Sequence, residues 1–456
     1  MGTRSSFTAD QEGVLAAPGA AHLSGTIKAS QPTKKEKREK PAVVIVAPNA
    51  SSLFGGEAVL PVHYFRVLRS RGRKVTLIAH ERNEPDLSSI FGVDCPDILY
   101  IGDTKWHRAI WRTGKLFPAQ IKNKIFGAFL GLLNERFQAR MIRQLVAEDR
   151  ADVIHQPTPV SPKTPSSVYG FGIPVVIGPM NGGMAYPPGY EDFNGSLERY
   201  LIPGARAVSS FVNQLIPGKS QAAALLVSNK RTRAALPIRH PNVIELVENG
   251  VDLGKFKPMA RGKPSPAGSI RLVFMGRLVG WKAVDVSLQA LSEARKRGVD
   301  ATLDILGDGE EMERLKQLRD RLNLEEAVTF HGFQPQTVCA KRLSESDALI
   351  LNSLFECGGA VVLEAMSIGL PVIASDWGGP ADYVDQSTGI LVSPCPRESF
   401  AARLADAICR LAADPQLRID MGQAGAGQIK STYDWDQKVS EIERIYDVVF
   451  AGQDRS

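Results

Sequence analysis

Two glutamates eight positions apart flank a pair of glycines in the stretch SLFECGGAVVLEAM, residues 353–366. The residues before them, ALILNS, predict a buried strand, and AVVLEAM after them predicts a helix. Gly358 and Gly359 then lie at the start of that helix, where free N–H groups and the helix dipole favour an anion. Glycine also lets a ligand approach the backbone closely. The sequence therefore predicts an anion site, with Glu356 just before it and Glu364 further along the helix.

The spacing of these two carboxylates does not suit hydrolysis, which needs two carboxyl groups facing one glycosidic bond about 5 to 10 Å apart. Glu364 would lie roughly 7 Å along the helix axis from Gly359, at about 1.5 Å per residue. An extended ligand with an anion in its middle and hydroxyl groups at both ends fits better, and a nucleotide-sugar is such a ligand. Alternatively, Glu364 is a solvated helix residue, although its neighbours in AVVLEAM are apolar.

A diphosphate also needs cations, and FMGRLVGWKAVD places Arg277 and Lys282 just after another predicted strand. A guanidinium and an ammonium there would neutralise the phosphates and stabilise a departing nucleoside diphosphate. Either residue alone is more often a surface charge. Together with Gly358 and Gly359 they predict one site.

The elements that would position these residues alternate along 456 residues, too many for one ordinary core. Short β-branched runs alternate with amphipathic stretches, the pattern of parallel sheets covered by helices. KPMARGKPSPAGS, residues 257–269, has linker composition, and the alternation restarts after it. We therefore expect an α/β fold of two doubly wound, Rossmann-like domains facing across a cleft. Their predicted limits are 41–256 together with 434–456, and 257–433.

Residues 1–40 contain no apolar segment of the secretory type and predict a disordered tail. No apolar run is long enough to span a bilayer. The net charge of +6 suits nucleic acid, an anionic membrane or a phosphorylated substrate equally. Five scattered cysteines without CxxC spacing favour a reduced, cytoplasmic compartment.

Other phosphate and metal motifs are incomplete. GDGEEM has Met312 where the third glycine of a dinucleotide fingerprint belongs, and IPGKS has Asn213 where the first glycine of a P-loop is needed. Asp434 in DWD precedes a helical stretch, where aspartate is expected as an N-cap. No group of residues has convincing metal spacing, so we expect neither a metal nor a cofactor beyond the nucleotide-sugar co-substrate.

The second half of the chain resembles the retaining glycosyltransferases of family 4, which have the two-domain GT-B fold. The family's E-x7-E motif is matched by Glu356 and Glu364, and its G-R-L-x-x-x-K motif by Gly276 to Lys282. VENGVDLGKFKP, LGDGEE and VTFHGF follow in the family's order. The resemblance covers residues 42–450, and ECGGAVVLEAM with DWGGPADY is similar to the bacterial exopolysaccharide branch.

The resemblance implies roles for individual positions. Arg277 and Lys282 would hold the diphosphate, and Glu364 would accept hydrogen bonds from the ribose. Glu356 is the implied catalytic-site residue, a positioning group for the donor sugar rather than a base. The backbone amides of the first helical turn would contact the same sugar, and a glycine pair in the first loop would admit diphosphate and acceptor. These donor-site positions are Gly358, Gly359, Ala360, Gly55 and Gly56.

One departure from the family concerns the histidine that many relatives carry after a strand of the first domain. Here IGPMNGGMAYPPG places Met180 and Asn181 in that region. His155 in VIHQP is an alternative cleft residue, although a histidine at a strand end is more often structural. The resemblance also implies that the final helix, from about Trp435 to Val449, crosses back onto the first domain.

The segment Lys105 to Lys124 combines six cations and several aromatic residues with no acid, and an apolar stretch follows it. Such a segment suits an anionic membrane surface. It equally suits a helix that packs on its own domain with a solvated basic side. Nucleic-acid binding would use similar charges, but no recognition motif accompanies them.

The sequence and the resemblance together predict a retaining hexosyltransferase that uses a nucleotide-sugar donor. Its acceptor would be a glycan, lipid-linked in this branch, and the enzyme would lie peripherally on the cytosolic face of the inner membrane. One alternative is a soluble transferase acting on a small sugar or sugar phosphate. The other is a non-catalytic nucleotide-sugar-binding scaffold.

Overall fold

The computed structural model describes residues 38–53, 56–114, 127–193, 209–256 and 264–453. The expected disordered tail at 1–40 lies almost wholly outside these residues, as do Gly55 and most of the expected linker at 257–269.

The first sheet has seven parallel strands in the order β3-β2-β1-β4-β5-β6-β7. This order reverses between β1 and β4, which is the topological switch point of a doubly wound sheet. Strands β1, β2 and β6 consist mainly of apolar residues and are buried along their whole length. The strands are β1 (Val43–Val46), β2 (Val75–His80), β3 (Ile98–Ile101), β4 (Val153–Gln156), β5 (Val175–Met180), β6 (Ala224–Val227) and β7 (Val243–Glu245).

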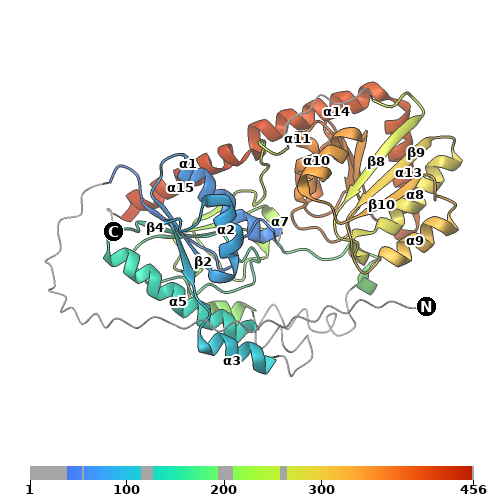
Figure 1. Ribbon diagram of the computed structural model, residues 1–456. Coiled ribbons are helices and arrows are strands. Elements are labelled where there is room, and N and C mark those ends of the chain that lie inside the picture. The colour runs from blue at the N-terminus through green and yellow to red at the C-terminus, as the bar shows by residue number, and fades with distance from the viewer. Residues whose placement is uncertain (1–37, 54–55, 115–126, 194–208, 257–263, 454–456) are drawn as a thin grey trace, which may run out of the picture. The chain divides into compact units, whose positions relative to one another are not determined.

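Alternate residues of β1 face two different layers of helices (Figure 1). Val43 and Ile45 contact the layer that contains α1 (Leu60–Ser70) and α2 (Glu84–Phe91). Val44 and Val46 contact α5 (Gly127–Ala147) on the other side. This period of two is the geometry of a strand buried on both faces. The remaining helices of this half are α3 (Lys105–Gly114) and the short α7 (Lys230–Ala234).

The second sheet has six parallel strands in the order β10-β9-β8-β11-β12-β13, so its switch point lies between β8 and β11. Its strands are β8 (Ser269–Met275), β9 (Asp300–Leu306), β10 (Val328–Gly332), β11 (Ala348–Leu351), β12 (Val372–Ser375) and β13 (Gly389–Val392).

Helices cover both faces of the second sheet as well, with α8, α9 and α13 to one side and α10 and α11 to the other in Figure 1. Their apolar side chains form one core with the strands. These helices are α8 (Val284–Lys296), α9 (Met312–Arg321), α10 (Gln336–Glu345), α11 (Ala360–Ser367), α12 (Pro380–Tyr383), α13 (Phe400–Ala413) and α14 (Pro415–Gln428).

The final helix, α15 (Trp435–Gln453), packs against α1 and the first sheet, as the resemblance implies (Figure 1). Val439 and Ile442 lie in the same core cluster as β1. In the same interface, Glu443 pairs with Arg71 at 2.7 Å and also with the buried Arg73. The expected N-cap is confirmed, since the side chain of Asp434 accepts from the backbone N–H of Asp436 at 3.4 Å.

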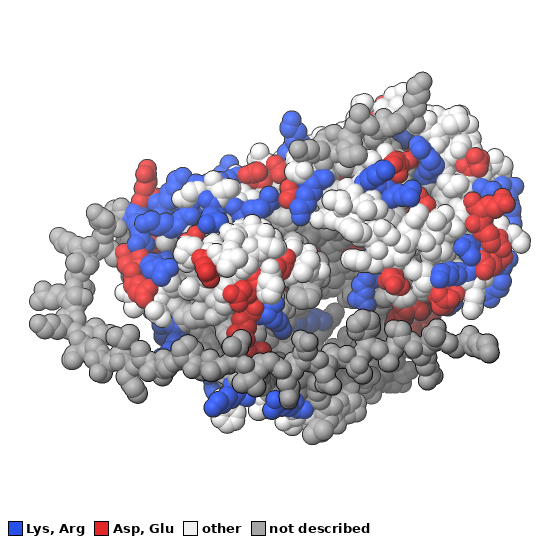
Figure 2. Space-filling view, viewed as in Figure 1, with Lys and Arg blue, Asp and Glu red and all other residues white. Residues whose placement is uncertain are grey.

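The expected class of two doubly wound, Rossmann-like sheets is therefore confirmed, while the exact domain limits remain a prediction. None of the helices in the described part of the chain is both long enough and apolar enough to span a membrane. On the face shown in Figure 2, Lys and Arg side chains lie among Asp and Glu side chains.

Candidate functional site

The two predicted motifs meet at the switch point of the second sheet. β8 and β11 are hydrogen-bonded neighbours, with Leu349 opposite Val273. Because both strands run in the same direction, the loops that follow them leave from one edge of the sheet. Ligands of doubly wound folds bind at this edge. The GRLVGWK segment follows β8, and the ECGG loop follows β11.

Backbone and side-chain hydrogen bonds tie these two loops together. Leu354 donates its N–H to the carbonyl of Trp281 at 2.8 Å. The amide of Asn352 donates to the carbonyl of Ala283 at 2.7 Å and also contacts the hydroxyl of Ser287. Ala283 has φ +52, a left-handed conformation that costs a non-glycine residue about 1 to 2 kcal/mol. The fold thus holds the residue next to Lys282 in a strained conformation.

The cation and the first glutamate of the two motifs form an ion pair. The ammonium of Lys282 contacts the carboxylate of Glu356, and their side chains are only 10% and 15% exposed. Lys282 also lies 4.9 Å from the ring centre of Trp281. Arg277 is exposed, and its side chain has no hydrogen bond or ion pair with another residue that the structure describes. Among the described residues, Lys282 is thus paired with Glu356, whereas Arg277 has no such partner.

The LGDG segment, incomplete as a dinucleotide motif, supports the GRL turn instead. Leu278 donates its N–H to the carbonyl of Asp308 at 2.9 Å. A side chain at Gly307 would collide with the carbonyl of Gly276, and one at Gly309 would collide with that of Leu278. These glycines are required by close contact between two backbones.

Gly358, Gly359 and Ala360 start α11, as expected, so the anion-favouring helix end lies next to the ion pair. Gly359 is the N-cap with φ +70 and offers no side chain to the first N–H groups. Gly358 has a second reason to be glycine, because a Cβ there would overlap the side chains of Glu248 and Asn249.

Glu364 lies on α11 among apolar neighbours and is only partly exposed. Burial raises its pKa to about 7, and Lys255 opposes the shift. Its carboxylate makes no hydrogen bond or ion pair with another described residue, so it is available to a ligand. The interpretation of Glu364 as a fully solvated surface residue does not fit this environment.

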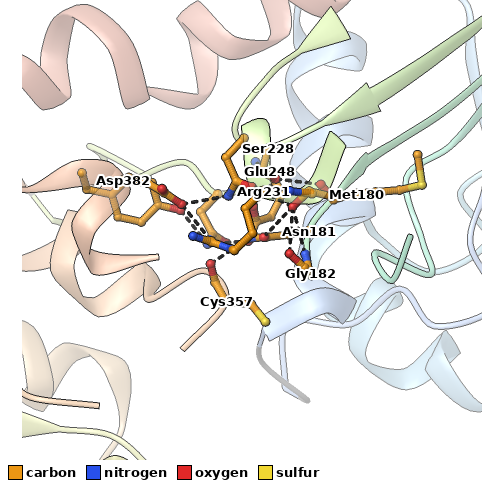
Figure 3. Close-up of polar contacts among 12 residues, drawn as sticks. Met180, Asn181, Gly182, Ser228, Arg231, Glu248, Cys357 and Asp382 are labelled. Carbon is orange, nitrogen blue, oxygen red and sulfur yellow. Dashed lines mark hydrogen bonds and ion pairs between the residues drawn. The ribbon is translucent and has the colours of Figure 1, made fainter. Parts of the chain in front are cut away.

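A buried polar cluster links the loop after β5 to the ECGG loop (Figure 3). The amide of Asn181 donates to the carboxylate of Glu248 at 2.6 Å and to the carbonyl of Cys357 at 2.8 Å. Ser228 donates its hydroxyl to the other oxygen of Glu248. Lys438 of α15 donates to the carbonyls of residues 247–249, and burial lowers its pKa.

A second contact beside this cluster involves Asp382 of α12 (Figure 3). Its carboxylate accepts from Arg231 at 3.1 Å and from the amide of Asn229 at 2.8 Å. The neighbouring Gly379 donates its N–H to the carbonyl of Glu356 at 2.7 Å. The DWGGPADY segment therefore touches both α7 and the loop that carries Glu356.

Three expected site positions belong to the first half of the chain: His155, Gly55 and Gly56. His155 is fully buried, donates to the carbonyl of Gly178 at 2.7 Å and accepts from the hydroxyl of Tyr446 at 2.7 Å, so it takes the structural role and not the cleft role. Burial lowers its pKa to about 4. Gly56 begins a short helical turn with φ +52 and open space around it. Gly55 lies outside the described residues, as does Lys124.

The comparisons with known proteins agree with this geometry. Residues 257–428 match the family model of the glycosyl transferases group 1. The alpha-D-kanosaminyltransferase of Streptomyces kanamyceticus is 30% identical over 176 residues, 38% of this chain and 45% of the relative. The lipopolysaccharide core biosynthesis glycosyltransferase LpsD of Rhizobium meliloti is 33% identical over 191 residues, 42% and 53% of the two chains. The chain thus spans about half the length of these curated relatives.

A solved structure extends the likeness to both sheets. Anabaena HepE in complex with UDP and glucose aligns with 89% of this chain and 99% of its own, with a TM-score of 0.58 and 16% identity. Segment 257–428 is therefore similar to the group 1 glycosyl transferases, and the chain has the GT-B fold of two Rossmann-like domains.

Sequence reasoning missed the cluster around Asn181 and Glu248. The only sign of this cluster in the sequence is that Asn181 and Glu248 each follow a predicted buried strand, and this does not show which residues they contact. The described residues contain no group of three or more His, Cys, Asp or Glu side chains suited to a metal ion. The expectation of a metal-independent reaction remains a prediction.

Proposed function

We propose that the protein is a retaining family 4 glycosyltransferase that moves a hexosyl group from a nucleotide-sugar to a glycan acceptor in exopolysaccharide or other cell-surface polysaccharide synthesis. One observation carries this proposal: Lys282 and Glu356 form an ion pair at the switch point, beside the uncapped start of α11, and Arg277 follows β8 at the same edge of the sheet. Cations beside free N–H groups are what a diphosphate needs.

The donor would extend along α11. Its diphosphate would bind Arg277 and Lys282, its ribose hydroxyls would donate to Glu364, and its sugar would lie near Glu356. Glu364 supports this placement, because an unpaired carboxylate that is partly removed from water is a strong hydrogen-bond acceptor when ionised. UDP in HepE is a nucleotide of the expected kind.

In the transfer, the bond between the anomeric carbon and the diphosphate oxygen breaks, and a bond from the acceptor oxygen forms on the same face. The acceptor's proton passes to an oxygen of the departing phosphate. Arg277 and Lys282 would stabilise the negative charge that develops on that group. Glu356 would orient the sugar and take no proton.

A lipid-linked acceptor at a membrane surface is part of the proposal. Lys105, Trp106 and Arg112 of α3 are exposed, which places cations and an indole where an anionic bilayer could meet them. Release of the protein from membranes by high salt would support this location. Free solubility at low salt would favour a soluble acceptor.

A thermal-shift panel of UDP-, GDP- and ADP-sugars tests donor binding. A ligand that binds the native state raises the melting temperature by mass action. One nucleotide class should stabilise the wild type and not Arg277→Ala. Arg410→Ala, at an exposed position of α13, is the matched control and should respond like the wild type. No shift with any donor at millimolar concentration would contradict nucleotide-sugar binding, which both the proposal and the scaffold alternative require.

A further inference from the structure

A pocket of about 340 Å³ lies on the first half of the chain, between the loop after β5 and α7. Cavities of this size hold small-molecule ligands. We call it the basic pocket, and the residues important here are Lys163, Met184, Ser209, Ser210, Arg231 and Ala234.

Among the lining residues that the structure describes, Lys163 and Arg231 are cations and none is acidic. Lys163 is exposed, and its ammonium has no ion pair with another described residue. Arg231 shares its charge with Asp382, which lies outside the lining. The hydroxyl of Ser210 adds a hydrogen-bonding group, while that of Ser209 already donates to the carbonyl of Lys163 at 2.9 Å. A site with net positive charge and a hydroxyl donor is chemically suited to a phosphate.

The basic pocket lies close to the loop that carries Glu356. Met184 forms part of its wall and contacts Gly378, where any side chain would collide with both Met184 and the carbonyl of Glu356. Trp377 donates to the carbonyl of Ala185 at 2.9 Å. The pocket wall therefore contacts the segment that packs against the backbone of Glu356.

Two large apolar side chains are exposed on the helical residues 209–215 that also supply the serines. Phe211 is 59% and Leu215 is 65% exposed. They lie four residues apart, which places them on one helix face. If the phosphate in the pocket carries a lipid, the lipid chain could therefore lie against these two side chains.

We propose that the basic pocket binds the phosphate group of the acceptor, so that the acceptor is a sugar phosphate, either free or joined through its phosphate to a lipid. This inference rests on the proposed glycosyl transfer and adds the acceptor's chemical class. A phosphate fixed at Lys163 and Arg231 would limit the acceptor hydroxyls that can reach the donor sugar.

The test is calorimetric titration of glucose 1-phosphate into protein saturated with the nucleoside diphosphate that binds best, so that the donor site is already filled. The wild type should bind this probe, while methyl glucoside, which lacks the phosphate, should not bind. Lys163→Ala should weaken binding about tenfold, the effect of losing one charge-assisted hydrogen bond. Ala234→Trp should abolish binding by filling the pocket. Arg233→Ala is the control, since this exposed residue of the same helix is not part of the lining.

Vesicles of phosphatidylcholine with and without a polyprenyl phosphate distinguish a lipid-linked sugar phosphate from a free one. For a lipid-linked acceptor, the polyprenyl phosphate should increase vesicle binding, and Phe211→Ser with Leu215→Ser should remove the increase while leaving glucose 1-phosphate binding unchanged. A free sugar phosphate predicts no increase. The inference is wrong if neither probe binds, or if Lys163→Ala and Ala234→Trp bind like Arg233→Ala. If these tests fail while the protein still binds nucleotide, the acceptor inference is wrong and the transferase proposal is not affected.

Discussion

At the scale of single residues, Lys282 has two competing anionic partners. Glu356 is its partner in the free protein, and the donor diphosphate would replace Glu356 on binding. A carboxylate beside the diphosphate also repels it. Glu356→Gln should therefore bind a nucleoside diphosphate a few-fold more tightly than the wild type, while turnover of the nucleotide-sugar falls at least a hundredfold. Calorimetry and release of nucleoside diphosphate measure the two effects. Weaker nucleotide binding in Glu356→Gln would mean that Glu356 is needed to orient Lys282.

Glu364 makes donor binding depend on pH. Its pKa is raised to about 7, and the ionised carboxylate accepts hydrogen bonds from the ribose at both oxygens, and more strongly than the protonated form. Affinity for the nucleotide-sugar should rise between pH 6 and 8 and level off above that range. An intact nucleotide-sugar is the proper ligand, because its diphosphate does not titrate there. Glu364→Gln should remove the dependence; the same pH profile in this variant would assign it to another group.

The residue types of the candidate donor site could be predicted from the sequence, because they lie within two short segments. The two segments follow β8 and β11, which are neighbours in the sheet, so the order of the strands is enough to bring them to the switch point. They carry Arg277, Lys282, Glu356 and Glu364. The ion pair between Lys282 and Glu356 and the contact of Asn181 with Cys357 could not be predicted. Both depend on distances between segments far apart in the chain, which local patterns do not contain.

At the scale of elements, the start of α11 is held by close packing at Gly358. Gly358→Ala should lower the free energy of unfolding by about 1 to 3 kcal/mol, because its Cβ would overlap Glu248 and Asn249. Urea unfolding measures this. Gly427→Ala is the matched control: Gly427 lies exposed in α14 with open space around it, and alanine there should add about 0.5 to 1 kcal/mol. Equal effects of the two substitutions would contradict the packing argument.

Strand prediction succeeded for buried β-branched runs and failed for one edge strand. The strands expected before the two motifs are present as β8 and β11, whereas β3 was not among the strands expected. β3 has four residues, lies at the edge of its sheet and is buried only at its two ends. Such a strand lacks the continuous apolar run of a central strand.

At the scale of the whole molecule, two histidines of the first half of the chain contact α15, one from the sheet and one from α1. His155 of β4 bonds to Tyr446, and His63 of α1 stacks on Trp435 with ring centres 4.6 Å apart. A carbonyl can only accept, so Nε2 of His155 carries the proton and Nδ1 accepts from Tyr446. The resemblance, more than local pattern, predicted where this helix docks.

Burial lowers the pKa of His155 to about 4 and that of His63 to about 3. The unfolded chain therefore binds more protons below pH 6.5, and stability should fall as pH decreases from 6.5 towards 4. The loss at pH 5 is at most about 2 kcal/mol per histidine. The raised pKa of Glu364 has the opposite effect between pH 4.5 and 7. The folded state keeps a proton there that the unfolded chain loses, so this group stabilises the fold more as the pH decreases. Urea unfolding at pH 5, 6 and 7 should show a smaller loss in His63→Phe; an unchanged loss would exclude His63 as a cause.

The most direct measurement is NMR of a nucleotide-sugar with the protein in water, before any acceptor is known. A retaining transferase should slowly transfer the sugar to water. Nucleoside diphosphate should then appear together with free sugar whose first-formed anomer has the donor's configuration, and Arg277→Ala should suppress both signals. Release of the opposite anomer would contradict retention. A donor that binds and stays intact, with the wild type no faster than Arg277→Ala, would contradict catalysis and favour a binding scaffold.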